Sequence, residues 1–549
     1  MRLSLNRLRQ QRDALQSVAK VLWRSGLGPA LGPRGWRAIS KAARRPAGPD
    51  AVFRIHAANK PEKLAVVESG RSRTKSYGEL NARIDRLRAG LAALGVGRRD
   101  RVAVCMKNRT EYVEAMSALS RLGAATVNVS WRSTPDELVY LVDHSGSKVL
   151  VFEDWLADRV RAAAPRLAGI VPGGLVSVGA ADGFARYEDL LRSGHEPAST
   201  GDSGGGAVIV YTSGTTGKPK GAVRDFPKEA SAAVMHFLAE LPFRHDDRHL
   251  VLCPLYHSAG FAFASMSFLL GATVVLIDDL DPENVLRTIE RERITSTMAV
   301  PTMLHRLVAL PDETRRRYDA SSLRVVVSGA APLSSALARR FQEAFGKVLY
   351  NFYGATETGL VTLAHPEELL SRPETIGRAI KGNDIRLVGP GGQDVSPGEV
   401  GELYVTNATL MAGYHADEAA TRGSRLGKHF SVGDLARRDA DGYYYIAGRK
   451  RDMIISGGVN VYPREVEDVL ERHPAIAEAA VVGVPDEEWG ERVRAFVALR
   501  EGFGVEPAEI IAYCRDHLAG VKVPREVRIM DALPRNPTGK VLKTALVGS

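Results

Sequence analysis

The segment from Tyr211 to Gly221, which reads Tyr-Thr-Ser-Gly-Thr-Thr-Gly-Lys-Pro-Lys-Gly, has the composition of a loop that binds phosphate. It follows an apolar run at 207–210, and such a run predicts a buried strand that leads into a turn. Glycines allow backbone N–H groups to converge on an anion, while hydroxyls and lysines add donors and positive charge. The segment is not a Walker A motif, because two residues separate Gly214 from Gly217 where that motif needs four. An exposed loop without a ligand is the alternative.

Six further segments follow this loop, and each of them has low specificity alone. They are Tyr353-Gly-Ala-Thr-Glu357, Gly401-Glu-Leu403, Ser431-Val-Gly-Asp434, Gly448-Arg449, Gly457-Gly-Val-Asn-Val-Tyr-Pro463 and Pro534-Arg-Asn-Pro-Thr-Gly-Lys540. In this order and at these separations, the set resembles the signature motifs of the adenylate-forming superfamily, which contains acyl-CoA synthetases, adenylation domains of peptide synthetases and luciferases. The resemblance covers the chain from residue 50 onward.

The resemblance implies that a carboxylic acid attacks the α-phosphate of ATP, giving acyl-AMP and pyrophosphate, and that the acyl group then passes to CoA. Joining two anions requires cationic and N–H donors and a divalent metal ion. Glu357 and Thr215 are the expected ligands of Mg²⁺, a hard cation that prefers oxygen donors. The residues expected on the ATP phosphates are Thr212, Ser213, Gly214, Thr215, Thr216, Gly217, Lys218 and Lys220.

The same resemblance places the rest of the nucleotide among residues that are scattered along the chain. Tyr353 is expected against the adenine, Asp434 on the ribose hydroxyls, and Lys540 between the carboxylate and the α-phosphate. Taken singly, these residues have ordinary interpretations as a core aromatic, a turn and a surface lysine. The full expected nucleotide set is Gly329, Ala330, Asn351, Phe352, Tyr353, Gly354, Thr356, Asp434 and Arg449, and the expected catalytic residues are Lys540, Glu357 and His257.

Residues 254–260, Pro-Leu-Tyr-His-Ser-Ala-Gly, resemble the entrance of the family's acyl pocket, with His257 near the carboxylate. Small and apolar residues continue to Phe268, and no charged side chain in this segment would hold an amino group. The sequence therefore favours a hydrophobic acid as substrate, a medium- or long-chain fatty acid. The expected pocket residues are His257, Gly260, Phe261, Gly329 and Gly354.

Transfer to CoA requires a second arrangement of the site in this family, in which the C-terminal domain rotates. The resemblance places Ser456, Gly457 and Gly458 at the CoA site, and adjacent glycines suit close approach of the backbone to a thin ligand. An ordinary β-turn is the alternative. The expected hinge is Arg451, at a position where many relatives have Asp or Lys.

Apolar periodicity predicts the elements that position these motifs. Residues 77–95 have the spacing of an amphipathic helix, and short apolar strands then alternate with helices up to residue 152. This alternation predicts right-handed βαβ units and parallel sheets covered by helices on both faces. Residues 156–206 are interpreted as a surface excursion, and residues 259–277 as a buried helix, turn and strand rather than a membrane span.

The chain has 549 residues, which is too long for a single core. A dense charge run at 449–452 marks the expected boundary of a last domain, in which helices at 464–472 and 507–518 flank strands at 479–483 and 495–499. The predicted fold is α/β, with a large N-terminal body of βαβ-built sheets and a small, mobile α+β C-terminal domain. The expected parts are a basic amphipathic extension at 1–46, an adenylation domain at 47–448 and the mobile domain at 449–549.

Residues 1–45 contain eleven Arg and Lys and one acidic residue, so this extension carries the whole net charge of +10. The remainder of the chain is neutral overall, which disfavours a nucleic-acid partner. An apolar helical face bordered by cations is typical of a helix that lies on an anionic membrane. A helix packed on the body, a disordered basic arm and an organellar transit peptide are the alternatives. The apolar face consists of Leu5, Leu8, Leu15, Val18 and Leu22, with Trp23 at its edge.

Cysteine usage and the N-terminus indicate the compartment. The three cysteines are far apart, and the start of the chain lacks a continuous apolar secretory region. We therefore expect a cytoplasmic protein, with association at the inner membrane face through residues 1–45 as an extension of that hypothesis. The expected function is fatty acid–CoA ligation with ATP, Mg²⁺ and CoA; an enzyme that loads a separate carrier protein and a catalytically silent scaffold are the alternatives.

Overall fold

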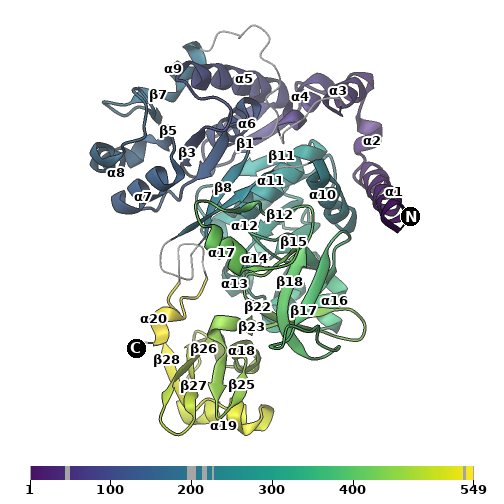
Figure 1. The fold of residues 1–549 in the computed structure, drawn as a ribbon, viewed down its shortest axis with the longest axis vertical. Coiled ribbons are helices and arrows are strands. Elements are labelled where there is room, and N and C mark those ends of the chain that lie inside the picture. Colours follow the sequence, from purple (N-terminus) through teal and green to yellow (C-terminus); the bar gives the residue numbers. More distant parts are fainter. Residues whose placement is uncertain are drawn as a thin grey trace.

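The computed structural model describes residues 2–43, 50–193, 206–212, 219–225, 228–535 and 540–547 (Figure 1). A large N-terminal body occupies most of the molecule, and the C-terminal residues form a smaller unit below it in the view of Figure 1. The arrangement confirms the predicted fold class, an α/β body followed by a small α+β domain.

One sheet of the body is built from the alternating strands and helices that the sequence predicts. Its central elements are β3 (Arg101–Cys105), α6 (Thr110–Leu122), β4 (Ala125–Asn128), α7 (Pro135–Ser145), β5 (Val149–Glu153), β6 (Leu175–Val178) and β8 (Val208–Thr212). The five strands are parallel, in the spatial order β8, β4, β3, β5, β6. Helices α5 (Tyr77–Ala93) and α7 begin with capping boxes, in which Ser76 and Thr134 accept from the third N–H of each helix.

The predicted surface excursion at 156–206 is wrong for its middle part. Strand β6 pairs in parallel with β5, and Val176 and Val178 are buried. Helix α8 (Ala157–Ala163) also buries Val160 and Ala163. The apolar run of β6 is short and lies between glycine- and arginine-rich stretches, so the average composition of the segment hides it.

The second body sheet brings the remaining site motifs to one edge. Its parallel strands, in spatial order, are β1 (Leu64–Glu68), β11 (Thr273–Leu276), β10 (Arg248–Val251), β12 (Ser296–Ala299), β13 (Val325–Ser328) and β14 (Leu349–Ala355). Residues 254–260 follow β10, Gly329 follows β13, and Tyr353 lies near the end of β14. Carboxyl ends of parallel strands meet at one edge, where open α/β sheets place their ligand sites.

Beyond β14 the same sheet becomes antiparallel. It continues through β15 (Gly359–Ala364), β16 (Thr375–Ala379), β23 (Tyr444–Arg449), β22 (Asp434–Arg438) and β18 (Val400–Thr406). Asp434 and Arg449 are register partners in β22 and β23. The antiparallel part therefore carries two of the expected nucleotide residues toward the carboxyl edge.

The apolar segment at 259–277 folds as predicted. It forms helix α11 (Ser258–Leu270), a turn at Gly271 with φ 78°, and the buried strand β11. In the part of the chain that the structure describes, no helix has both the length and the apolarity needed to cross a bilayer.

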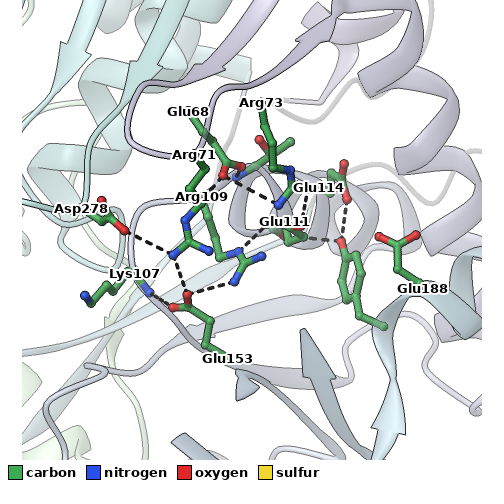
Figure 2. Close-up of polar contacts among 12 residues, drawn as sticks. Glu68, Arg71, Arg73, Lys107, Arg109, Glu111, Glu114, Glu153, Glu188 and Asp278 are labelled. Carbon is green, nitrogen blue, oxygen red and sulfur yellow. Dashed lines mark hydrogen bonds and ion pairs between the residues drawn. The ribbon is translucent and has the colours of Figure 1, made fainter. Parts of the chain in front are cut away.

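Buried ion pairs join the two body sheets (Figure 2). Arg109, just before α6, contacts Glu111 at 2.7 Å and Glu153 at 2.9 Å, and Arg71, from the loop after β1, contacts Glu153 at 3.0 Å. Burial alone would raise the pKa of Glu111, but Arg109 and then Arg73 outweigh it and lower this pKa to about 2. These carboxylates therefore remain charged, and the charges fasten one sheet to the other.

The C-terminal unit has its own sheet and core. It contains β24 (Ile454–Ser456), β25 (Val459–Val461), α18 (Pro463–Arg472), β26 (Ile476–Asp486), β27 (Gly490–Leu499), α19 (Pro507–His517) and β28 (Glu526–Met530). Val466, Leu470, Val481 and Val497 are buried in a core separate from those of the body. The body sheet extends through Arg449, and the short helix η3 (Lys450–Asp452) connects it to this unit.

The N-terminal extension forms three helices that pack on the body. These are α1 (Arg2–Arg24), α2 (Leu27–Ala30) and α3 (Pro33–Ala43), which lie against α10 (Lys228–Glu240) and α4 (Ala51–Asn59). Ser17 and His236 form a hydrogen bond of 2.8 Å, and Asp13 forms an ion pair of 3.0 Å with Lys381. Of the alternatives for this segment, the structure favours a helix packed on the body, and a disordered arm is wrong for the described residues.

The face that α1 buries differs from the predicted apolar face. Val21 is buried and Val18 and Leu22 are half-buried, whereas Leu15 is 70% and Trp23 82% exposed. Periodicity correctly predicted an amphipathic helix. The face that packs on the body, however, contains Ser17, which is hydrogen-bonded to His236. The side chains of Leu5 and Leu8 lie outside the described residues.

Candidate active site

A cavity of about 1450 Å³ lies where the carboxyl edge of the body meets the C-terminal unit. It brings together most of the described residues that the sequence predicts for the site. Those that line it are Thr212, Lys220, Phe261, Ala330, Asn351, Phe352, Tyr353, Gly354, Thr356, Glu357, Asp434, Arg449, Arg451 and Lys540. His257, Gly260, Gly329, Ser456, Gly457 and Gly458 are not among its lining residues.

The two ends of the expected phosphate loop are fixed in the cavity wall. Strand β8 and strand β9 (Lys220–Arg224) are antiparallel, with Thr212 opposite Lys220. The Lys220 ammonium lies 3.3 Å from Asp417 and 5.4 Å from the centre of the Tyr414 ring. The predictions for Ser213, Gly214, Thr215, Thr216, Gly217 and Lys218 fall outside the described residues.

Glu357 lies nearly buried beside the base of this loop. Its Oε1 accepts hydrogen bonds from Thr212 Oγ1 and Tyr414 Oη, each at 3.2 Å. Arg224 underlies it and donates to the carbonyl oxygens of Thr356 at 2.8 Å and Thr409 at 2.9 Å. A carboxylate and a hydroxyl are hard oxygen donors that fit Mg²⁺, and Glu357 would hold the ion with Thr212 close by.

Tyr353, Asp434 and Arg449 form a second cluster on the opposite part of the wall. Tyr353 Oη donates to Asp434 Oδ2 at 2.7 Å, and Arg449 Nε lies 3.2 Å from Asp434 Oδ1. Burial and then the Asp434 charge raise the pKa of Tyr353 well above its usual range, so this phenol stays protonated. The cluster fixes a carboxylate acceptor next to an aromatic ring, and the ribose and adenine contacts at these residues stay predictions.

The backbone between β13 and β14 comes close enough that side chains are excluded. A Cβ at Gly329 would lie 2.4 Å from the Phe352 ring, and one at Gly354 would lie 2.0 Å from the carbonyl oxygen of Gly359. Ala330 has a φ of 65°, in the left-handed region. Ala330 and Gly354 line the cavity directly. Gly329 does not line it, but the absence of a side chain at Gly329 allows the Phe352 ring to pack close to the backbone.

Lys540 reaches this site from the far end of the chain. Desolvation of its ammonium, with Arg449 and Arg451 nearby, lowers its pKa, while Asp434 and Glu357 oppose that change. Lys540 lines the cavity, and the residue as a whole is exposed to solvent. The carboxylates that the sequence assigns to ribose and metal therefore share the electrostatic environment of the expected catalytic lysine.

His257 precedes α11 and lies behind the cavity wall. Its Nε2 is buried and has no hydrogen-bond partner among the described residues. Burial first, and then Lys540 and Arg132, lower its pKa to about 4, so the imidazole is neutral near pH 7. The structure thus places His257 within electrostatic reach of Lys540 but not directly on the cavity. Gly260, one turn later, is required because a Cβ there would lie 2.4 Å from the Pro254 carbonyl oxygen.

The Ser456–Gly458 segment is a tight hairpin between β24 and β25. Gly457 and Gly458 have φ values of 58° and 78°, as a two-residue hairpin turn requires. A Cβ at Gly457 would lie 2.6 Å from the Trp489 ring. In this arrangement of the two domains the ordinary turn is what is observed, and CoA binding at these residues stays a prediction.

Sequence reasoning missed Tyr414, Asp417 and Arg224. Tyr414 lies in β19 (Gly413–Tyr414), which pairs with β9 and so reaches Glu357 across the sheet. No sequence pattern marks it, since the partners are 57 residues apart. Arg224 had a weak signal, because it lies four residues after Lys220 on the strand that leaves the phosphate loop.

Comparisons with known proteins agree with this geometry. The profile of the family described as AMP-binding enzyme matches residues 53–415, and that of its C-terminal domain matches residues 465–540. A feruloyl-CoA synthase of Amycolatopsis sp is 38% identical, covering 88% of this chain and 95% of the relative. A long-chain-fatty-acid–CoA ligase of Mycobacterium tuberculosis is 34% identical, covering 90% and 97%. The solved structure of an amide bond synthetase from Marinactinospora thermotolerans has a TM-score of 0.82 at 28% identity, covering 91% and 99%.

Proposed function

Since the chain belongs to the AMP-binding enzymes and is a CoA ligase of the adenylate-forming superfamily, we propose that it joins a hydrophobic carboxylic acid, a medium- or long-chain fatty acid, to CoA. ATP and Mg²⁺ serve the first half-reaction, and CoA is the acceptor in the second.

One observation carries the proposal: a single cavity is lined both by the charged residues Asp434, Glu357 and Lys540 and by apolar side chains of helices α4, α10 and α11. Val52, Val234 and Met266 belong to this apolar part of the lining, which we call the apolar arm. An acid lying in this cavity would have its carboxylate at the charged end and its tail among apolar side chains. Burial of each methylene in such an arm stabilises binding by about 0.8 kcal/mol.

In the first half-reaction the carboxylate oxygen forms a bond to the α-phosphorus of ATP, and pyrophosphate leaves with the electrons of the broken P–O bond. Lys540 would reduce the repulsion between the two anions, because its positive charge lies on the same cavity as Asp434 and Glu357. A bound Mg²⁺ supplies positive charge to the departing phosphates. Neutral His257 adds no competing charge behind the carboxylate.

In the second half-reaction the CoA sulfur bonds to the acyl carbon and AMP leaves. The thiol proton passes to solvent or to the departing phosphate. Lys540 is not needed for this step, and the Ser456–Gly458 hairpin would replace it after the C-terminal unit rotates about Arg451.

The substrate is the finer part of the proposal. The two curated relatives act on different acids, ferulate and a long-chain fatty acid, by their names. The lining on α4, α10 and α11 is mostly apolar, with Ser231 and Ser265 among its few hydroxyls, and this composition supports an aliphatic tail over a phenolic ring.

Two other functions stay open as candidates. An enzyme that loads a carrier protein would share the first half-reaction, and the likeness to an amide bond synthetase keeps an acceptor other than CoA in view. A silent scaffold is disfavoured because Lys540 and Glu357 are both present and both face the same cavity.

The test supplies ATP, Mg²⁺ and one acid at a time, with hexanoate, decanoate, hexadecanoate and ferulate as the series. Pyrophosphate release without CoA measures activation, and loss of free thiol after CoA addition measures transfer. We expect both signals, with kcat/KM rising along the aliphatic series. Pyrophosphate release without thiol loss would indicate a different acceptor, release with ferulate alone would contradict the fatty-acid assignment, and no release would contradict the enzyme.

Peripheral contact with an anionic membrane is a separate, secondary proposal, and it would place the cytoplasmic protein at the inner face. The exposed Leu15 and Trp23 on α1, beside exposed Arg12, are the observation that favours it. Salt-sensitive binding to phosphatidylserine vesicles that Leu15→Ser and Trp23→Ser remove would support it. Wild-type protein that ignores such vesicles at low salt would contradict it.

A further inference from the structure

The N-terminal extension contributes to the lining of the same cavity. Val18 of α1 and Ile39 and Ala42 of α3 line the same cavity as Tyr353 and Lys540. The family profile begins at residue 53, so all three side chains lie outside the part of the chain that the family shares. The extension is therefore an addition that reaches the site.

The extension is fixed in place by bonds along its length. Arg24 donates to the Ala239 carbonyl oxygen of α10 at 3.0 Å, and the His245 N–H donates to the carbonyl oxygen of Ser25 at 2.9 Å. Asn59 of α4 accepts from the N–H of Gly32 at 2.9 Å and donates to the Ala30 carbonyl oxygen at 3.2 Å. These bonds hold α1 on α10 and α2 on α4.

Apolar packing fixes the inner face of the extension against the helices that form the arm. Val21 and Leu31, each about 5% exposed or less, share a core cluster with Phe237 of α10 and Phe263 of α11. Ile39 packs at the margin of the same cluster. Ile39 therefore has a position set by a packed core, and Val18 lies on the same helix as the buried Val21.

None of the described charged side chains of the extension lines the cavity. Lys20 pairs with Glu240 at 3.5 Å and Arg24 is bonded to α10. Among the described residues of the extension, only Val18, Ile39 and Ala42 line the cavity. A wall of this composition offers contact to methyl and methylene groups and gives no partner to a second carboxylate.

We propose that the inner face of α1 and α3 is the distal wall of the acyl pocket and sets the length and bulk of the acid that the enzyme accepts. The proposal rests on the function proposed above and adds to it. Its ligand is the far end of an unbranched aliphatic tail, which passes α11 and ends against Val18, Ile39 and Ala42.

The test adds volume at the wall and compares acids of different length. Val18→Phe and Ala42→Phe should each lower kcat/KM for hexadecanoate by at least about tenfold, a usual effect of steric exclusion from an apolar pocket. Hexanoate, which ends before the wall, should keep its kcat/KM within about twofold. Leu15→Phe is the matched control, because this side chain lies on the same helix and is 70% exposed; it should leave both values unchanged.

Equal loss for both acids, or no loss for either, would overturn the proposal. Melting temperatures of all variants identify any that fail to fold, and Ile39→Ala then decides, because it removes volume without crowding the core. That variant should shift the preferred acid to a longer chain, and an unchanged profile would count against the wall. Failure of the proposed function would appear differently, as a wild type that releases no pyrophosphate with any acid.

A hexadecanoate analogue with a diazirine at its terminal carbon gives a second readout that does not depend on turnover. On irradiation it should label peptides of α1 or α3 in the wild-type protein, and excess hexadecanoate should prevent the labelling. Labelling confined to α11 or to the outer surface would overturn the proposal.

Discussion

The molecule has two internal interfaces, here called seams: the first lies between the two body sheets and the second between the body and the C-terminal unit. They differ in the burial of the polar contacts that stabilise them. Between the two body sheets, Arg71 contacts Glu153 at 3.0 Å and Arg73 contacts Glu111 at 2.9 Å (Figure 2). Arg109 binds both carboxylates from their own side, at 2.9 and 2.7 Å. Between the body and the C-terminal unit, the described polar contacts include Arg472 with Glu374 and Arg535 with Thr302 at 3.2 Å. Arg472 is half exposed, whereas the side chains of Glu111 and Glu153 are at most 3% exposed.

This difference separates the tasks of the two seams. The first seam fixes one sheet against the other, so that Thr212 of the first sheet stays within 3.2 Å of Glu357 beside the second. The second seam closes the cleft with Lys540 but is weak enough to open, because exposed pairs contribute little. We propose that the molecule combines a fixed nucleotide site with a catalytic lysine that moves with the C-terminal unit.

The largest effect is expected at the residue that crosses the weak seam. Lys540→Ala should reduce pyrophosphate release by several orders of magnitude, since it removes the positive charge that is held where two anions meet. Thioester formation from supplied acyl-AMP should largely survive. Lys522→Ala, an ion-paired lysine on the outside of the same unit, is the control. Equal loss of both half-reactions would remove the distinction between the seams.

Restricting η3, which connects the two domains, should impair transfer to CoA more than activation, the reverse of the effect expected for Lys540→Ala. Proline fixes φ, so Arg451→Pro should hold η3 in one conformation and reduce thioester formation far more than pyrophosphate release. Arg451→Ala removes the same side chain but leaves the backbone free, and it should retain more of the second half-reaction. Normal turnover of the proline variant would place the hinge elsewhere.

The strong seam should respond in stability rather than in the balance of half-reactions. Arg109→Met removes the buried cation that Glu111 and Glu153 share and leaves each with one partly exposed partner, Arg73 or Arg71, which we expect to cost about 3–5 kcal/mol of the free energy of unfolding. Arg422→Met, which breaks an exposed pair with Glu418, should cost less than about 1 kcal/mol. Urea unfolding measures both. Similar values for the two variants would show that the buried network does not fasten the sheets.

A smaller effect is expected in the pH dependence of this seam. The pKa of Glu111 falls from its ordinary 4.5 to about 2 in the folded protein, so its contribution is complete above pH 4.5 and is lost as pH falls toward 2. Glu111→Gln should therefore flatten the fall in stability between pH 4.5 and pH 2. Unfolding curves over this range check the expectation, and parallel curves for wild type and variant would contradict it.

The sequence predicted most of the body because apolar runs and polar loops alternate there with little ambiguity. It also predicted which residues meet at the cleft, since Thr212, Glu357, Asp434 and Lys540 belong to ordered motifs. The contribution of Tyr414 could not be predicted, because its hydrogen bond to Glu357 depends on the pairing of β19 with β9. The face that α1 buries could not be predicted either, because an amphipathic pattern does not identify the residues of the body against which the helix packs.

His257 illustrates a different limit. The sequence correctly placed it before an apolar helix, and its ring packs on that of its chain neighbour Tyr256, with the ring centres 4.3 Å apart. The lowered pKa of its imidazole depends partly on Lys540, which lies far away in the chain, so no local pattern marks it. The proposed distal wall has the same limit, because Val18 of α1 lines the same cavity as Val234 of α10, which comes much later in the chain.

The central claim is that one cleft performs two half-reactions and that only the weak seam opens between them. Cysteines at Glu374 and Arg472, joined by a short bismaleimide, would close that seam permanently, and the three native cysteines are all buried. The cross-linked protein should still release pyrophosphate from acid and ATP, but thioester formation from supplied acyl-AMP and CoA should fall at least about tenfold relative to the single-cysteine variants. Full turnover with CoA after complete cross-linking would contradict the account.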